Sequence, residues 1–190
     1  MINIRNISPL IRLGILDLAD FSQIKVGFPK RELEKAGSQF LLKEMLKTDA
    51  FELNYTPEKK PFLKSRTEHI SISHSHDKLA IIINEKENTG IDIELIRDKV
   101  LKIQHKFLNQ KETEFTKNNV EKLISVWAAK EAMYKVYGLK ELDFKLNLFI
   151  EEFDDAVIFG KIDIGSFKKR YQLICENVDD YKMVDVLNEI

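Results

Sequence analysis

The chain has 190 residues, of which 44% are hydrophobic, and this is enough apolar material to build a sizeable core. Thirty basic residues stand against 31 acidic ones, so a formal net charge of -1 excludes a general attraction to nucleic acid or to an anionic membrane. The single cysteine excludes an intramolecular disulfide, and no apolar run approaches the ~20 residues needed to cross a bilayer. Because the start also lacks the pattern of a signal peptide, we expect a cytoplasmic, globular protein.

The first half of the chain alternates segments typical of strands and helices. Residues 30–47 carry apolar side chains at a spacing of about 3.6, which predicts a helix, whereas residues 56–66 contain two prolines and four basic residues and indicate a surface loop. Segments 69–74, 79–84 and 89–94, joined by short turns, predict an antiparallel meander. In chain order, the expected elements are a strand at 10–18, a loop through Pro29, the helix at 30–47, a strand at 50–55, the basic loop, and the three strands of the meander.

The second half begins with helices and returns to strands. A helix is predicted at 100–108 and a longer one at about 119–137, where Asn118 or Asn119 provides a cap and Gly138 a stop. Strands are then expected at 144–150, 156–164, 171–178 and 181–187. This order predicts a two-lobed α+β protein with an N-terminal lobe at 1–88 and a C-terminal lobe at 89–190.

The stretch TGIDIE at 89–94 places two carboxylates in an apolar strand. Side chains alternate between the faces of a strand, so Asp92 and Glu94 share one face while Ile91 and Ile93 share the other. Two carboxylates this close disfavour each other's ionisation unless a cation or a proton intervenes. The strand therefore predicts one side of a metal site, or else an acidic edge that faces solvent.

A third carboxylate, Glu131, interrupts the apolar stripe of the predicted helix at 119–137. A buried charge must be paired, bound to a metal or protonated, unless it lies at the exposed end of the stripe. The structural alternative is a surface ion pair with Lys135, one helical turn away. Together with Asp92 and Glu94, Glu131 would complete a set of oxygen donors that favours Mg²⁺ over zinc.

Side chains that suit phosphate binding lie before the predicted metal ligands in the sequence and also beside them. Lys60, Ser73 and His74 combine positive charge, a hydroxyl and an imidazole, and Lys130 and Lys135 add positive charge beside the predicted metal ligands. We interpret this as a site for a multiply phosphorylated small molecule. The simpler alternative for Ser73 and His74 is the hydrophilic end of a strand.

Three stretches, SISHS at 71–75, GIDIE at 90–94 and WAAKEAMYK at 127–135, resemble the 4'-phosphopantetheinyl transferase superfamily in order and spacing. The similarity is greater to the two-lobed, surfactin-synthetase-activating type than to the short trimeric type. The resemblance is strong over about residues 60–147. It implies two similar α+β lobes related by a pseudo-twofold, each a small antiparallel sheet packed with helices, in a monomer.

The resemblance also implies an enzyme that moves the 4'-phosphopantetheine group of coenzyme A to a serine of an apo acyl, peptidyl or aryl carrier protein, releasing 3',5'-ADP. Asp92, Glu94 and Glu131 would hold Mg²⁺. Glu131, directly or through a metal-bound water, would be the base, and Lys135 would support the transferred phosphate or the leaving group. Lys60, Ser73 and His74 would contact coenzyme A phosphates.

The sequence departs from the family pattern at Gln39, where arginine is common, at Lys59, where glycine is usual, and at Ala128, where serine or threonine is usual. Lys30, Arg31 or Lys64 could compensate for Gln39 in contacts with the nucleotide's phosphate. Two alternative functions remain open. One is a non-catalytic module that binds a carrier protein or a nucleotide, and the other is a metal-dependent phosphodiester hydrolase.

Overall fold

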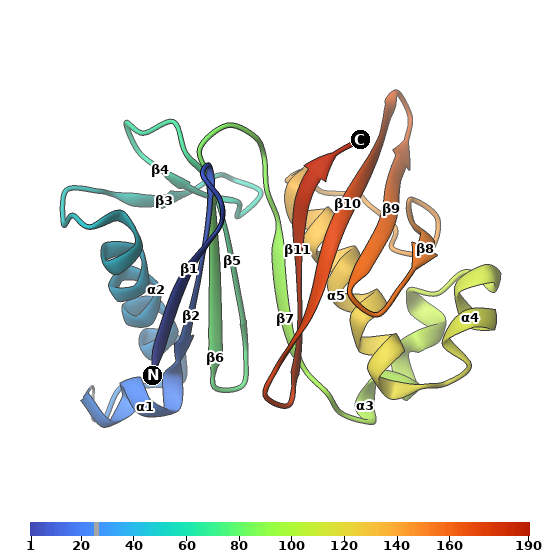
Figure 1. Ribbon diagram of the computed structural model, residues 1–190, viewed down its shortest axis with the longest axis horizontal. Helices are drawn as coiled ribbons and strands as arrows, with labels where there is room; N and C mark the ends of the chain where they lie inside the picture. Colours follow the sequence, from blue (N-terminus) through green and yellow to red (C-terminus); the bar gives the residue numbers. More distant parts are fainter. Residues whose placement is uncertain (25–26) are drawn as a thin grey trace. The chain divides into compact units, whose positions relative to one another are not determined.

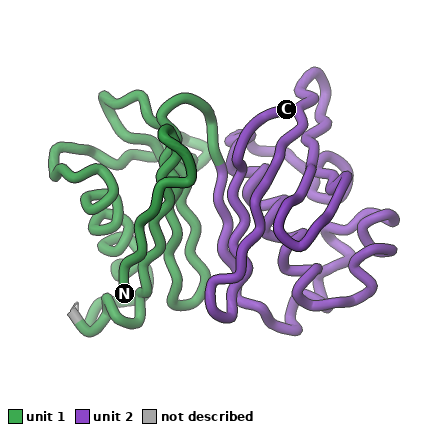
Figure 2. The backbone as a smooth tube through the Cα atoms, in the orientation of Figure 1, with its two compact units in different colours: residues 1–89 green, residues 90–190 purple. Residues whose placement is uncertain are grey.

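The chain divides into two compact units, Met1–Thr89 and Gly90–Ile190, in a computed structural model that describes residues 1–24 and 27–190 (Figure 2). Each unit contains an antiparallel sheet packed with helices, which confirms the predicted α+β class. The pseudo-twofold relation between two lobes stays a prediction. No helix within the described ranges is both long and apolar enough to pass through a bilayer.

The first unit is built on a four-stranded sheet in the order β1-β2-β6-β5 (Figure 1). Helix α2 contacts β2 and β6, and its buried Leu41, Leu42 and Met45 join the core formed with Leu79 and Ile81. The sheet strands are β1 (Ile2–Ser8), β2 (Ile11–Asp17), β5 (His69–Ser75) and β6 (Lys78–Asn84). The remaining elements are α1 (Leu18–Ile24), α2 (Lys30–Leu46), β3 (Leu53–Tyr55) and β4 (Pro61–Leu63).

Three parts of the first unit differ from the predictions. Strand β1 was not predicted, although Ile2 and Ile4 alternate with polar residues as in a strand, and both side chains are exposed. Residues 18–24 form α1 rather than a loop, while residues 25–26 of that predicted loop lie outside the described residues. The basic segment 56–66 is only partly a loop, because β4 pairs with β3 in a hairpin.

The second unit has a five-stranded antiparallel sheet in the order β7-β11-β10-β9-β8. Helix α5 contacts all five strands and covers one face of this sheet (Figure 1). The strands are β7 (Ile91–Leu95), β8 (Leu148–Phe153), β9 (Val157–Ile164), β10 (Phe167–Val178) and β11 (Tyr181–Glu189). The helices are α3 (Lys99–Ile103), the short 3₁₀ helix η1 (Gln104–Lys106), α4 (Gln110–Thr116) and α5 (Val120–Tyr137).

The predicted meander is wrong at its third strand. Strands β5 and β6 do pair with each other, but β7 pairs with β11 in the sheet of the second unit. The short turn at 85–90 favoured a local hairpin, whereas the actual partner of β7 lies far along the chain. Sequence periodicity carries no information about such a distant pairing.

Helix α5 begins and ends where its sequence predicts. The Asn119 side chain accepts a hydrogen bond from the backbone N–H of Lys122 at 3.0 Å, and Gly138 adopts the left-handed conformation, φ 68°, that closes many helices. Beside the helix, a Cβ at Gly90 would lie 2.0 Å from the carbonyl oxygen of Ala132. Only glycine therefore allows the start of β7 to lie this close to the backbone of α5.

Candidate functional site

Strand β7 and helix α5 bring Asp92 and Lys135 into direct contact. The Lys135 ammonium donates to Asp92 Oδ1 at 2.8 Å and to the carbonyl of Ile91 at 2.8 Å. Asp92 is 4% exposed, so it does not belong to a solvent-facing acidic edge. Lys135 also pairs with Asp92 rather than with Glu131, so the alternative of a surface pair along the helix is not formed.

Glu94 lies two residues along the same strand and is partly buried. One of its carboxylate oxygens, Oε1, accepts a hydrogen bond of 3.0 Å from the indole nitrogen of Trp127 on α5. The two carboxylates of β7 are thus held by donors of different charge, an ammonium at Asp92 and a neutral indole at Glu94.

Glu131 lies between Trp127 and Lys135 on α5, one helical turn from each. Burial, the largest cause, together with the negative charges of Asp92 and Glu94, raises the pKa of its carboxyl group from the usual value of 4.5 to about 7. The positive charge of Lys135 opposes this shift in pKa. A carboxyl group that titrates near neutral pH can both accept and release a proton under ordinary conditions.

The three carboxylates suit a hard cation by their chemistry. Among the described residues, no three His, Cys, Asp or Glu side chains form a ready-made metal-binding group. Asp92 and Glu94 are nevertheless close enough to Glu131 to raise its pKa, and a bound cation would relieve that repulsion. Mg²⁺ usually binds one or two carboxylates together with water and substrate phosphates. The donor set therefore fits Mg²⁺ that arrives with a phosphorylated ligand.

Lys130 is placed differently from the expected phosphate contact. Its side chain is 0% exposed, and its ammonium donates to Glu112 Oε2 at 2.7 Å and to the carbonyls of Phe107 at 2.6 Å and Phe144 at 2.8 Å. Three acceptors use all three protons of the ammonium group. We therefore do not carry Lys130 into the proposed phosphate site.

In the first unit, the structure brings two of the predicted phosphate-binding residues near one carboxylate. Glu34 of α2 lies 3.3 Å from His74 Nδ1 and 3.9 Å from the ammonium of Lys30. Arg31 is exposed on the next position of the helix. Ser73 is buried and, as the neighbour of His74 on β5, projects from the opposite face of the sheet.

Lys60 lines a separate pocket of about 240 Å³ in the first unit. Burial lowers the pKa of its ammonium, which donates to Asn88 Oδ1 at 3.2 Å. The preceding residue, Lys59, has φ 71°, a backbone conformation that glycine adopts more readily than lysine. The other residues of the pocket are Thr56, Pro61, Phe62, Glu68, His69 and Ile70.

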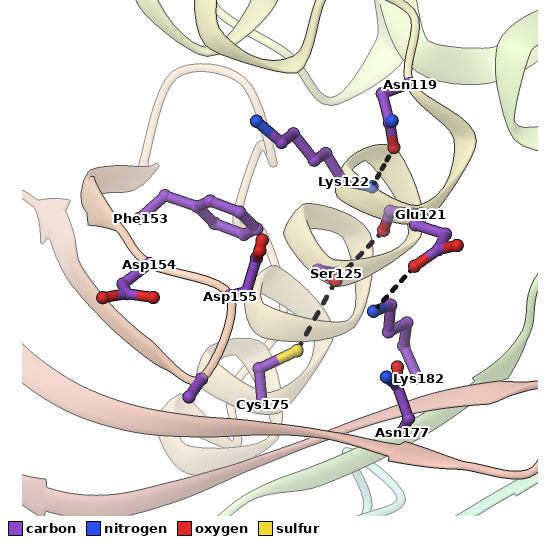
Figure 3. Close-up of a pocket in the computed structure, with 11 residues that line it drawn as sticks. Asn119, Glu121, Lys122, Ser125, Phe153, Asp154, Asp155, Cys175, Asn177 and Lys182 are labelled. Atoms are coloured by element: carbon purple, nitrogen blue, oxygen red, sulfur yellow. Dashed lines mark hydrogen bonds and ion pairs between the residues drawn. The ribbon is translucent and has the colours of Figure 1, made fainter.

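Two cavities lie among the described residues of the second unit. The smaller, about 180 Å³, is bounded by Glu94 and Trp127 together with Leu95, Arg97, Lys99, Val100, Ile103 and Ile124. The larger, about 490 Å³, lies at the start of α5 and is shown in Figure 3.

The larger cavity has mostly polar walls. Lys182 forms an ion pair of 3.1 Å with Glu121, and the buried thiol of Cys175 lies 3.5 Å from the hydroxyl of Ser125 (Figure 3). Burial raises the pKa of that thiol, which disfavours the reactive thiolate. In the sheet register Lys182 is directly opposite Glu94, so the two side chains share a face.

Sequence reasoning missed Trp127, Glu112 and Lys182 as parts of this region. A local signal existed for Glu112, since Asn109 and Glu112 form a capping box at the start of α4. That signal locates a helix start but not the burial of Glu112 against Lys130. Trp127 belongs to the apolar stripe of α5, and a hydrogen bond from its indole N–H gives no pattern in the sequence.

A family model described as the 4'-phosphopantetheinyl transferase superfamily matches residues 88–183. The matched range contains β7, α5 and every residue of the carboxylate cluster. A comparison with curated proteins found no match.

Proposed function

We propose that this chain, which belongs to the 4'-phosphopantetheinyl transferase superfamily, transfers the 4'-phosphopantetheine group of coenzyme A to a serine of an apo carrier protein and releases 3',5'-ADP. The observation that carries the proposal is the cluster formed by β7 and α5. There, Glu131 titrates near neutral pH beside Asp92 and Glu94, with Lys135 at hydrogen-bond distance from Asp92. The two-lobed, surfactin-synthetase-activating type is the finer assignment that we favour.

In this reaction, the serine oxygen attacks the phosphorus that carries pantetheine, and the bond from that phosphorus to the bridging oxygen of 3',5'-ADP breaks. Glu131 accepts the serine proton, directly or through water, and its pKa of about 7 matches this role at neutral pH. Lys135 offers positive charge to the transferred phosphate or the leaving group. Bound Mg²⁺, held by Asp92, Glu94 and Glu131, would neutralise negative charge on the pyrophosphate.

In the first unit, we assign contacts with coenzyme A phosphates to Lys60, Ser73 and His74, with Lys30 and Arg31 supplying charge that the family's arginine would give at Gln39. The lowered pKa of Lys60 supports this, because a desolvated ammonium gains more from pairing with a phosphate than a solvated one does. The imidazole of His74 is 50% exposed and open to a ligand.

Mass spectrometry of an apo carrier protein incubated with the chain, Mg²⁺ and coenzyme A tests the proposal. The carrier should gain the mass of one phosphopantetheine, and omission of Mg²⁺ in EDTA should abolish the gain. Free phosphopantetheine without carrier modification would select the hydrolase, and coenzyme A binding without any product would select the non-catalytic module.

The matched variant for this assay is Glu131→Gln, which keeps the size of the side chain but removes its charge. Turnover should fall by roughly 10² or more, the low end for the loss of an acid or base. Glu114→Gln, an exposed carboxylate of α4, serves as the control and should transfer at the normal rate. Transfer at the normal rate by Glu131→Gln would contradict the assignment of the base.

A further inference from the structure

The indole of Trp127 holds Glu94 without neutralising it. The hydrogen bond from Nε1 to Glu94 Oε1 measures 3.0 Å, and it limits the rotation of the carboxylate while leaving its charge intact. At Asp92 the situation is the reverse, because the Lys135 ammonium compensates the charge. The Trp127 hydrogen bond therefore orients the Glu94 carboxylate, whereas a cation that approaches Asp92 competes with a lysine.

Trp127 is itself fixed by two aromatic rings. Phe107 packs edge-on at 5.2 Å between ring centroids, and Phe144 stacks at 5.3 Å with an interplanar angle of 25°. Phe144 also packs against Tyr134 of α5, with 5.5 Å between the ring centroids. An indole held between rings has few alternative rotamers, so the direction of its N–H is well defined.

The buried ammonium of Lys130 fixes the backbone of the same two phenylalanines. This group donates hydrogen bonds to the carbonyls of Phe107 and Phe144, whose rings pack against Trp127. Its counter-ion, Glu112, is also 0% exposed and accepts backbone N–H groups of Asn109 and Ile150, each at 2.9 Å. Each polar atom of the Lys130 and Glu112 side chains thus forms a hydrogen bond with a backbone group, and this favours a single arrangement of the rings.

We propose that Trp127 is a positioning residue that orients Glu94 toward the cation of the reaction, and that the Lys130–Glu112 pair holds Trp127 in place. This inference rests on the proposed function, since it assigns to Glu94 a role in binding the metal. Partners that orient metal ligands commonly change metal affinity or activity by 10- to 100-fold when they are removed.

The contact can be tested without any activity. Trp127 is the single tryptophan of the chain, so a ¹H–¹⁵N spectrum of the metal-free protein contains one indole signal. A hydrogen bond to a carboxylate should move this signal downfield and slow its exchange with water. Glu94→Gln should shift it, whereas Glu121→Gln, an exposed carboxylate of the same helix, should not. An indole signal that Glu94→Gln leaves unmoved would overturn the proposal.

The consequence for the metal is tested with Trp127→Phe, which keeps the ring but removes the donor. The Mg²⁺ concentration at half-maximal transfer, and the Mg²⁺ dissociation constant measured calorimetrically with coenzyme A present, should both rise about 10-fold. Tyr134→Phe, which keeps the aromatic packing and the Trp127 donor, should leave both values unchanged. Normal transfer with an unaltered Mg²⁺ dependence in Trp127→Phe would refute the positioning role and leave the proposed function standing. Absence of transfer in the wild type would refute the proposed function, while the indole signal would still decide the contact.

Discussion

The surroundings of Glu131 disfavour the ionised form of its carboxyl group. It occupies a position of α5 where the apolar stripe of the helix would otherwise continue, and it faces two other carboxylates. Such a residue lowers the stability of the folded protein whenever it is charged. Stability measurements therefore report on its protonation state.

The sign of the pH dependence follows from the two pKa values. An unfolded chain releases the Glu131 proton near pH 4.5 and the folded chain near pH 7, so between these values the folded state binds more protons. The contribution of Glu131 to stability is then intact below about pH 4.5 and is lost as the pH rises through 7, by at most about 3 kcal/mol. Glu131→Gln should remove this dependence.

We expect the free energy of unfolding of Glu131→Gln, measured by urea titration in EDTA, to match the wild type at pH 4.5 and to exceed it at pH 8. The control Glu114→Gln should show the same difference from wild type at both pH values. A constant offset for Glu131→Gln across this range would mean that its carboxyl group titrates normally in the folded protein.

At the scale of elements, the site depends on how closely β7 approaches α5. A Cβ at Gly90 would collide with the backbone of Ala132, which cannot move without displacing the helix. Gly160 of β9 offers a matched contrast, because its shortest contacts, at 2.8 and 2.9 Å, are with the flexible side chain of Met133. Gly90 directly precedes β7, Gly160 lies in β9 of the same sheet, and both lie against α5.

Gly90→Ala should therefore destabilise the protein by at least about 2 kcal/mol and separate Asp92 from Lys135. Gly160→Ala should cost roughly 1 kcal/mol or less, since the methionine can change rotamer. Chemical denaturation of both variants, with transfer assays under conditions where each is folded, measures the difference. Equal costs would show that α5 adjusts freely to the strand.

A second prediction at the scale of elements concerns the buried ion pair of Lys130 and Glu112. Lys130→Met leaves an uncompensated carboxylate in the core and should cost about 3–5 kcal/mol. The double variant Lys130→Met/Glu112→Gln should recover a large part of this cost, because the neutral amide can still accept a backbone N–H. Denaturant titrations of both variants provide the measurement.

The pair of Lys182 with Glu121 is the matched control for that experiment, because both lysines are paired with carboxylates but Glu121 is 61% exposed. Lys182→Met should cost about 1 kcal/mol or less. If Lys130→Met were equally mild, the buried ammonium would contribute little to holding the rings around Trp127.

The sequence was most informative where structure is local. Helix α5 was predicted from its cap at Asn119, its stop at Gly138 and its apolar stripe, and it forms at Val120–Tyr137. The pairing of β5 with β6 was likewise found from two apolar runs and a short turn. The meander failed because the partner of β7 is distant, and the buried setting of Lys130 was missed because its counter-ion lies on another helix. A lysine next to a glutamate in sequence looks the same whether it faces solvent or the core.

For the whole molecule, a net charge of -1 does not attract an anionic ligand, so its binding depends on local positive groups. Coenzyme A brings several phosphates, and the carboxylates of β7 and α5 repel them unless a cation is present. Coenzyme A should thus raise the melting temperature in Mg²⁺ and have little effect in EDTA. By linkage, coenzyme A should strengthen Mg²⁺ binding by the same factor, which calorimetry can measure. An equal rise in melting temperature in EDTA would contradict the coupling.

The position of β11 between β7 and β10 bears on how the chain acquires its structure during synthesis. All four strands of the first sheet are complete by residue 84, whereas β7 pairs with residues about 90 positions further along, at a large cost in loop closure. The strand that carries Asp92 and Glu94 therefore leaves the ribosome long before its partner does. The first sheet can form on the nascent chain. Strand β7, by contrast, cannot pair with β11 until residues 181–185 have emerged from the ribosome.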